Sequence, residues 1–154
     1  MKKILGLVIL LVVLAGCCRD SDYDERITPL LQQLEEFENS RDLSGIVVRV
    51  EPEIISLSDM PDFMRIRITN YSRRAFHGGR HHTIEYYSNG TWELIGTYHQ
   101  ILFAGDSVII TPGRTFGMNS ILISGLYHPL NVGKYRLVYG DWQEYWYTIF
   151  FLIE

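Results

Sequence analysis

Histidines and carboxylates are the side chains that could do chemistry in the middle of this chain of 154 residues. His81 and His82 are adjacent, and His77 precedes them across Gly78-Gly79. Neighbours in a strand point to opposite faces, so His81 and His82 cannot readily chelate one metal ion together. His77 could join one of them in a loop site. We favour solvent-facing loop histidines, with a metal-dependent enzyme as a less favoured alternative.

Other catalytic arrangements have even less support. No serine or cysteine lies in a motif that would supply a general base and an oxyanion-binding loop. Paired carboxylates of the glycosidase kind meet only in three dimensions. Glu85 and Glu93 could face each other across a hairpin, but an exposed pair of like charges is the commoner arrangement. The sequence therefore predicts no catalytic residue, no bound metal and no cofactor.

The only two cysteines, Cys17 and Cys18, stand directly behind an apolar run, Ile4 to Gly16, which follows two lysines. Thirteen apolar residues are fewer than the roughly 20 that cross a bilayer, but they suit a secretory signal peptide. The run ends in "LAGC", Leu14 to Cys17, which resembles the bacterial lipobox. In that motif a signal peptidase cuts before the cysteine, whose sulfur carries a diacylglyceryl group.

The resemblance implies a lipoprotein signal peptide at residues 1–16 and an acylated Cys17 at the new N-terminus. Each buried methylene contributes about 0.8 kcal/mol, so two or three acyl chains would hold the protein firmly in a membrane. The expected location is the bacterial cell envelope, either periplasmic or at the cell surface. Two alternatives are that Cys17 and Cys18 simply close a signal sequence or bind metal, and adjacent thiols lack further ligands nearby.

Composition and charge narrow the classes of partner. Aromatic residues make up 13% of the chain and ten are tyrosines, which favours sheet over helix. Residues 19–62 hold twelve acidic and four basic residues, whereas residues 63–154 hold six acidic and eight basic residues. That basic excess is small and spread along the sequence, so we expect no nucleic-acid partner. An envelope protein or a glycan is the expected partner class.

The region after Cys17 is divided into two parts. Residues 17–27 are polar and acidic, and predict a flexible tether. "TPLLQQLEEFE", Thr28 to Glu38, predicts a short helix within residues 28–44. Thr28 would cap this helix, Pro29 would take its first position, and its leucines and Phe37 would form one stripe. We expect that stripe to pack on the edge of a domain.

From Gly45 onward the apolar residues recur with a period of two, which is typical of strands. Asn89-Gly90 between two such runs is a strong hairpin signal. About eight short strands separated by turn residues predict an antiparallel β-sandwich. The expected strands are Ile46–Glu51, Phe63–Thr69, Thr83–Tyr87, Thr91–Ile95, Ser107–Thr111, Asn119–Ser124, Lys134–Tyr139 and Glu144–Ile153.

Four segments in this order resemble the bacterial immunoglobulin-like domains of small lipoproteins. They are "RIRITNYS" (Arg65 to Ser72), "TIEYYSNGTWELI" (Thr83 to Ile95), "ITPG" (Ile110 to Gly113) and "LNVGKYRLVYG" (Leu130 to Gly140). The family commonly has proline where this chain has Val132. The resemblance implies an all-β, immunoglobulin-like sandwich over residues 45–154, and it carries no catalytic residue to this chain.

Alternation assigns side chains to the faces of these strands. Trp92 and Leu94 are expected in the core, with Glu93 pointing outward. Arg136 is expected on the opposite face of its strand from Tyr135 and Leu137. The last strand, Glu144 to Ile153, is apolar or aromatic on both faces. Its second face must be covered by the helix, by a partner or by self-association.

We therefore expect a lipid-anchored envelope protein whose domain is a non-catalytic binding or structural module. The alternative is a surface lipoprotein that binds a glycan or peptide through exposed tyrosine and tryptophan side chains.

Overall fold

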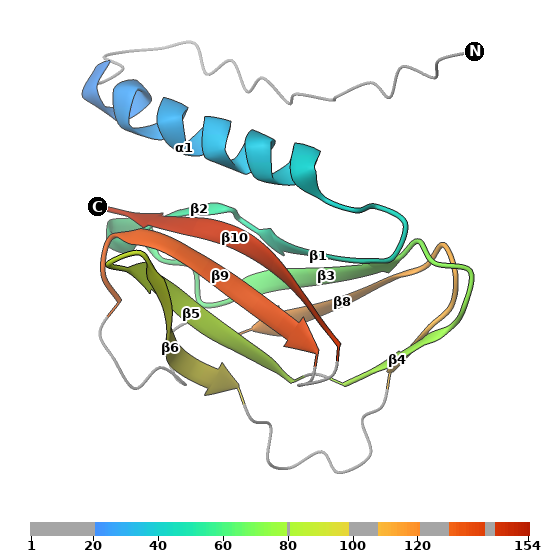
Figure 1. Cartoon of the computed structure of the whole chain (residues 1–154). Coiled ribbons are helices and arrows are strands. Elements are labelled where there is room, and N and C mark those ends of the chain that lie inside the picture. Colours follow the sequence, from blue (N-terminus) through green and yellow to red (C-terminus); the bar gives the residue numbers. More distant parts are fainter. Residues whose placement is uncertain (1–20, 80, 99–107, 121–129, 141–143) are drawn as a thin grey trace, which may run out of the picture.

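The computed structural model describes residues 21–79, 81–98, 108–120, 130–140 and 144–154. Two β-sheets pack face to face, and one helix lies across the outside of the larger sheet (Figure 1). This arrangement confirms the prediction of an all-β sandwich with one helix. The elements are α1 (Ser21–Ser40), β1 (Ile46–Glu51), β2 (Ile54–Ser56), β3 (Met64–Asn70), β4 (Phe76–Gly78), β5 (His82–Ser88), β6 (Thr91–Tyr98), β7 (Val108–Ile110), β8 (Thr115–Ser120), β9 (Gly133–Gly140) and β10 (Tyr145–Ile153), with a 3-10 turn at Leu57–Asp59.

The sheets have the strand orders β1-β3-β8, β2-β10-β9-β5-β6 and β4-β7. Neighbouring strands are antiparallel except β2 and β10, which run parallel. The chain passes from the three-stranded to the five-stranded sheet between β1 and β2, where the Glu51-Pro52 peptide bond is cis. β2 and β4 are strands that the sequence pattern did not predict, and both are only three residues long. β8 begins at Thr115, four residues before the predicted start at Asn119, and residues 121–124 of that prediction lie outside the described part.

The core lies between the two larger sheets, and strict alternation builds it. In β3, Met64, Ile66 and Ile68 are fully buried, whereas Arg65 and Arg67 are exposed. Each such buried side chain contributes about 1.5–3 kcal/mol of hydrophobic stabilisation. The other buried members of this cluster are Ile46, Val48, Val50, Ile55, Ile84, Ile110, Met118, Tyr135, Leu137, Tyr139, Phe150 and Leu152.

The predicted hairpin joins β5 and β6. Asn89 and Gly90 both have left-handed backbone angles, with φ of 50° and 83°, as a two-residue turn of this kind requires. The prediction that Trp92 and Leu94 enter the core is wrong. Trp92 packs against the cluster beneath the helix, and Leu94 is 58% exposed. In the register of the sheet, Trp92 lies opposite Tyr87 and Leu94 lies opposite Glu85, and these two residues of β5 belong to its outer face.

Helix α1 is longer than predicted. It is described from Ser21, so Thr28 is not its cap and Pro29 lies inside it. Residues 21–27 of the predicted tether are therefore helical, and residues 17–20 lie outside the described part. Nowhere in the described ranges is a helix both long and apolar enough to cross a membrane.

The apolar stripe of α1 covers the second face of β10, but the prediction that Leu31 belongs to this stripe is wrong, because its side chain is 53% exposed. Leu34 is buried against Ile149 and Phe151, and the ring of Phe37 lies 5.5 Å from that of Tyr147. Of the three expected coverings of the last strand, the helix is therefore confirmed.

Arg41, immediately after the helix, fastens its C-terminal end to the sandwich. Its guanidinium binds Glu38 and the Val48 carbonyl, and donates to the Tyr147 carbonyl at 2.9 Å. Glu38 also binds Arg49 of β1 at 2.6 Å. Burial lowers the pKa of Arg41 from its usual value. These contacts tie the helix to both sheets.

Two buried polar side chains fix loops of the sandwich. The hydroxyl of Tyr135 donates to the Asn131 carbonyl at 2.6 Å and accepts from the Asn131 amide at 3.0 Å. This contact is a tyrosine corner, a feature of immunoglobulin-like sandwiches. Asn70 is fully buried; its amide group donates to the carbonyls of Arg74 and Ile110, and its oxygen accepts from Ser72. The Asn-x-Ser segment is therefore a structural turn.

Candidate functional site

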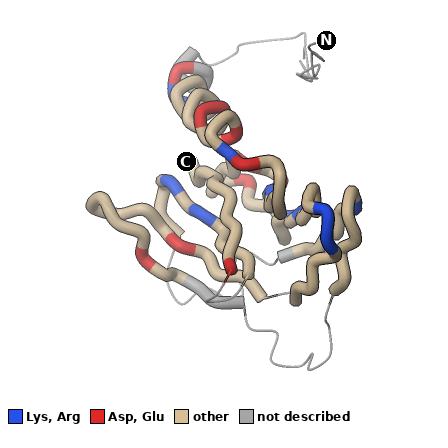
Figure 2. Tube along the Cα trace, turned by 45° about the vertical axis from the view of Figure 1, so that its right-hand side comes forward, with Lys and Arg blue, Asp and Glu red and all other residues tan. Residues whose placement is uncertain are grey.

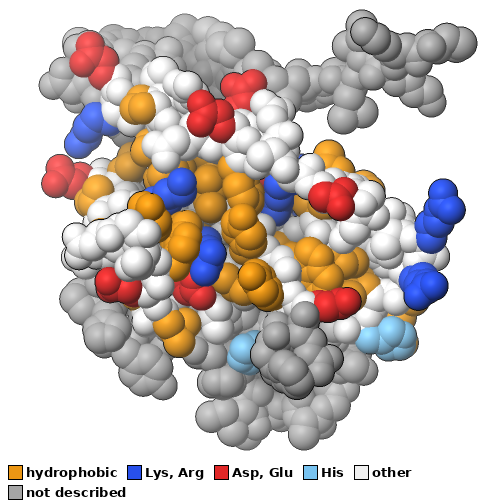
Figure 3. Space-filling view, viewed as in Figure 1, with side chains coloured by type: hydrophobic (Ala, Val, Ile, Leu, Met, Phe, Trp, Pro, Cys, Tyr) orange, Lys and Arg blue, Asp and Glu red, His pale blue; other side chains and the backbone are white. Residues whose placement is uncertain are grey.

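A groove of about 400 Å³ lies between α1 and the outer face of the five-stranded sheet. We call it the helix–sheet groove. Figure 3 shows hydrophobic side chains gathered over this region with basic side chains among them. The lining residues come from the helix and from three strands: Gln33, Glu36, Phe37, Ser40, Trp92, Lys134, Arg136, Tyr147 and Ile149.

Arg136 organises the sheet side of the groove. Its guanidinium carbon lies 4.6 Å from the centroid of Trp92 and 5.6 Å from that of Tyr147. Its Nε donates to a carboxylate oxygen of Glu85 at 2.5 Å. The side chains of Arg136 and Glu85 are only 24% and 19% exposed. Cation–π contacts of this partly desolvated kind are worth about 1–2 kcal/mol, so the two rings are held in fixed positions.

The groove offers flat rings and hydrogen-bonding groups. Tyr147 is 40% exposed and Tyr87, whose ring lies 5.0 Å from that of Trp92, is 42% exposed. Lys134 Nζ lies 3.5 Å from the side-chain oxygen of Gln33 on the helix. This set can stack on and hydrogen-bond to a ligand. The serine of the lining, Ser40, donates its hydroxyl to the Phe37 carbonyl rather than to a carboxylate.

The alternation of the sequence placed Arg136 on the opposite face of its strand from Tyr135 and Leu137, as the structure does, and left open which face of the last strand carries Tyr147 outward. It missed Lys134 and the helix residue Gln33 as groove residues. The spacing of Lys134 and Arg136 by two was an available signal, because residues two apart in a strand share a face. Gln33 could not be predicted as a groove residue, because the periodicity of a helix does not determine the angle at which it packs on a sheet.

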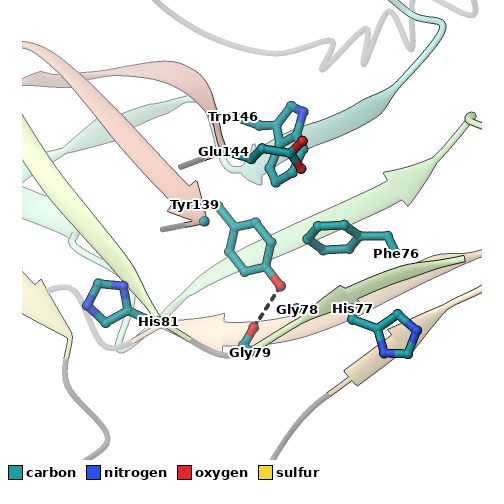
Figure 4. A pocket seen from close by; sticks show the side chains of 9 residues that line it. Phe76, His77, Gly78, Gly79, His81, Tyr139, Glu144 and Trp146 are labelled. Atoms are coloured by element: carbon teal, nitrogen blue, oxygen red, sulfur yellow. Dashed lines mark hydrogen bonds between the residues drawn. The ribbon is translucent and has the colours of Figure 1, made fainter. Parts of the chain in front are cut away.

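A second pocket, of about 260 Å³, lies at one end of the sandwich (Figure 4). Tyr139 forms its floor and donates a hydrogen bond of 2.7 Å to the Gly79 carbonyl. Burial raises the pKa of Tyr139 to about 12, so its phenol stays protonated and cannot act as a base near neutral pH. Trp146 packs edge-to-face on Phe76 with ring centroids 4.9 Å apart. The pocket is chiefly an aromatic one.

The three histidines do not converge in this pocket. His77 and His81 lie on opposite sides of Tyr139 and Phe76 in Figure 4. His82 is 1% exposed, so the prediction that all three are solvent-facing is wrong for this residue. Alternation explains the difference, because His82 begins β5 on its inward side while His81 points out. In the described part of the chain, no group of three histidine, cysteine or acidic residues could hold a metal ion.

Glu85 and Glu93 do not form a pair. In the register of β5 and β6, Glu85 lies opposite Leu94, and Glu93 lies opposite Tyr86. A register shift between Ile84 and Glu85 alters the pairing expected from the hairpin alone. Glu85 instead neutralises Arg136. Cys17, the predicted lipidation site, lies outside the described residues.

The comparison with protein families decides the class of the domain. The family model described as a bacterial Ig-like domain matches residues 42–147. The chain belongs to this bacterial Ig-like domain family. Domains of the family are generally non-catalytic, which agrees with a binding or structural module and with the arrangement of the groove.

Other comparisons add little. Among curated proteins, none is similar to this chain. A solved structure of a β-glucosidase from Erythrobacter marinus is similar to 71% of this chain at 16% identity, with a TM-score of 0.41. The similarity spans 15% of the glucosidase chain, and a likeness this weak says nothing of activity.

Proposed function

We propose that the protein is a lipid-anchored module of the bacterial cell envelope that binds without catalysing a reaction. The observation that carries the anchor is the sequence Leu14-Ala15-Gly16-Cys17, placed directly after a charged and an apolar segment. Two or three acyl chains on Cys17 would give lasting attachment to a membrane. The membership of the bacterial Ig-like domain family supports a non-catalytic role for the folded part.

The anchor is tested by Cys17→Ser. We expect the wild-type protein in the membrane fraction of a bacterial host and the variant released from it, with the same circular-dichroism spectrum for both. Cys18→Ser is the matched control, because it removes a thiol one residue away from the motif, and it should stay in the membrane fraction. Retention of Cys17→Ser in membranes would contradict the proposal.

The helix–sheet groove favours a second candidate function, in which the module recognises a glycan or an extended peptide. Trp92, Tyr147 and Arg136 converge there, and Glu85 binds the guanidinium that packs against the two rings. Rigid aromatic rings provide contact area at little loss of conformational entropy.

Glycan-array and peptide-array binding by the purified protein tests this second candidate. Tyr147→Ala should abolish the signal, because the exposed ring is lost from the groove. Ile109→Ala is the control, since this side chain is 59% exposed but lies on β7, in a different sheet from the groove. Equal loss from both variants would contradict recognition in the groove.

A further inference from the structure

The outer face of the β1-β3-β8 sheet is strongly basic, although the sequence spreads its charges. Figure 2 shows the basic residues of these strands gathered on the right-hand side of the molecule. Five exposed arginines and one half-buried arginine belong to this sheet or to the turns at its end. They are Arg49, Arg65, Arg67, Arg73, Arg74 and Arg114.

One line of side chains runs along the middle strand of this face. Arg65, Arg67 and Thr69 alternate with the buried residues of β3, and so share its outer side. Phe63 and Tyr71 continue the same alternation at the two ends and are 49% and 50% exposed. At about 3.3 Å per residue, the line from ring to ring is roughly 26 Å long. It places two guanidinium groups between two exposed rings.

The flanking strands leave room beside this line. In the register of the sheet, Arg67 lies between Arg49 of β1 and Gly117 of β8. A side chain at Gly117 would meet no atom closer than 4.0 Å, so its absence leaves an open hollow. That hollow measures about 330 Å³ and is lined by Arg65, Arg67, Thr115, Gly117, Met118 and Asn119. A ligand group can therefore approach both arginines from the β8 side.

The positive charge is only partly neutralised. Glu51 lies 3.0 Å from Arg67, but both side chains remain about half exposed, at 48% and 47%. Arg49 is paired with Glu38 of the helix at 2.6 Å. Within the described ranges, no carboxylate forms an ion pair with the remaining four arginines of this face. The face therefore complements a partner that carries several negative charges.

We propose that this face, from Phe63 to Tyr71, binds a linear anionic polysaccharide. Guanidinium groups bind carboxylate or sulfate oxygens through two parallel hydrogen bonds. Rings at both ends of the arginines suit an extended chain whose sugar faces stack on them, whereas a bilayer surface requires no such line. The choice of a glycan over a nucleic acid rests on the envelope location proposed above. This site is separate from the helix–sheet groove, which lies on the other sheet.

Isothermal titration calorimetry of the full chain carrying Cys17→Ser, purified without detergent so that vesicles stay intact, tests the proposal. The probes are polygalacturonate, the uncharged linear glucan pullulan, and vesicles of phosphatidylglycerol. We expect binding to polygalacturonate that weakens as salt rises, and none to pullulan. Arg65→Gln with Arg67→Gln should weaken binding at least about tenfold, since two charge-assisted contacts are lost. Phe63→Ala should weaken it about threefold or more through the loss of one stacking surface.

The control variant, Arg26→Glu, lowers the net charge by the same two units away from both this face and the groove, and should change affinity less than about twofold. All variants should keep the wild-type melting temperature, because the substituted side chains are not in the core. Absence of binding to polygalacturonate, binding to vesicles only, or equal weakening by the double variant and by Arg26→Glu would overturn the proposal. None of these results bears on the anchor, which the fractionation of Cys17→Ser tests separately.

Discussion

Removing the hydroxyl of Tyr135 tests whether the tyrosine corner stabilises this sandwich. The ring is 1% exposed and lies 5.3 Å from the ring of Phe150, so Tyr135→Phe keeps the packing and deletes only the oxygen. Burial raises the pKa of the Tyr135 hydroxyl, which therefore remains a donor at neutral pH. The substitution breaks two hydrogen bonds to Asn131, at 2.6 and 3.0 Å.

Each such bond contributes about 0.5–1.5 kcal/mol net, so the two together predict a loss of about 1–2 kcal/mol. The estimate stays at this level because Asn131 is exposed and its backbone groups can turn to water. For a domain of this size, the melting temperature should fall by roughly 4–8 °C.

Urea unfolding followed by tryptophan fluorescence measures this loss directly. The midpoint should fall while the slope with denaturant stays unchanged, since the folded state buries the same surface. Tyr87→Phe is the control: this tyrosine is 42% exposed in the same sheet, and its loss of a hydroxyl should cost less than about 0.5 kcal/mol. A loss for Tyr135→Phe no larger than that of the control would refute the reasoning.

Three further substitutions test other parts of the fold. In urea unfolding, Leu34→Ala should destabilise the fold by about 2–3 kcal/mol, because it leaves a cavity beneath the helix. Leu31→Ala is the control; this side chain is 53% exposed, and its loss should cost less than about 0.5 kcal/mol. Gly78→Ala should destabilise the fold by about 1–3 kcal/mol, because a methyl group there would overlap the Tyr139 hydroxyl and the Phe76 ring. Gly45→Ala is the control, since a methyl group there meets nothing within 4 Å, and only Gly78→Ala should lower the melting temperature. Burial raises the pKa of Glu53 above its ordinary value of 4.5, so the folded state holds this proton more tightly. The free energy of unfolding should therefore fall as pH rises from about that value through the raised pKa. Glu53→Gln should remove that part of the pH dependence and be more stable than the wild type at pH 7; an unchanged profile in thermal unfolding between pH 4 and 8 would contradict it.

The sequence was sufficient for features that depend on local periodicity. The alternation of β3 and the Asn89-Gly90 turn predicted a strand and a hairpin that the structure contains. The two apolar faces of β10 predicted that its second face is covered, and α1 covers it. The sequence predicted Trp92 in the core between the sheets, whereas it packs in the cluster beneath the helix. Periodicity shows which residues of a strand share a face, but not which of the two faces is turned to the core.

Features that depend on how distant segments pair could not be predicted from the sequence. The basic face arises because β1, β3 and β8 bring together arginines that lie far apart in the chain. The groove needs a helix, an edge strand and β9 to meet at one place. The sequence predicted a start of α1 that is too late, because proline is common at the first position of a helix. In the structure, Pro29 lies within the helix, which is described from Ser21.

Mass spectrometry of the protein purified from membranes with detergent tests the proposed anchoring most directly. The account predicts a chain that begins at Cys17 and carries a diacylglyceryl group on that sulfur. A chain that still begins at Met1, with no acyl group on Cys17, would contradict it.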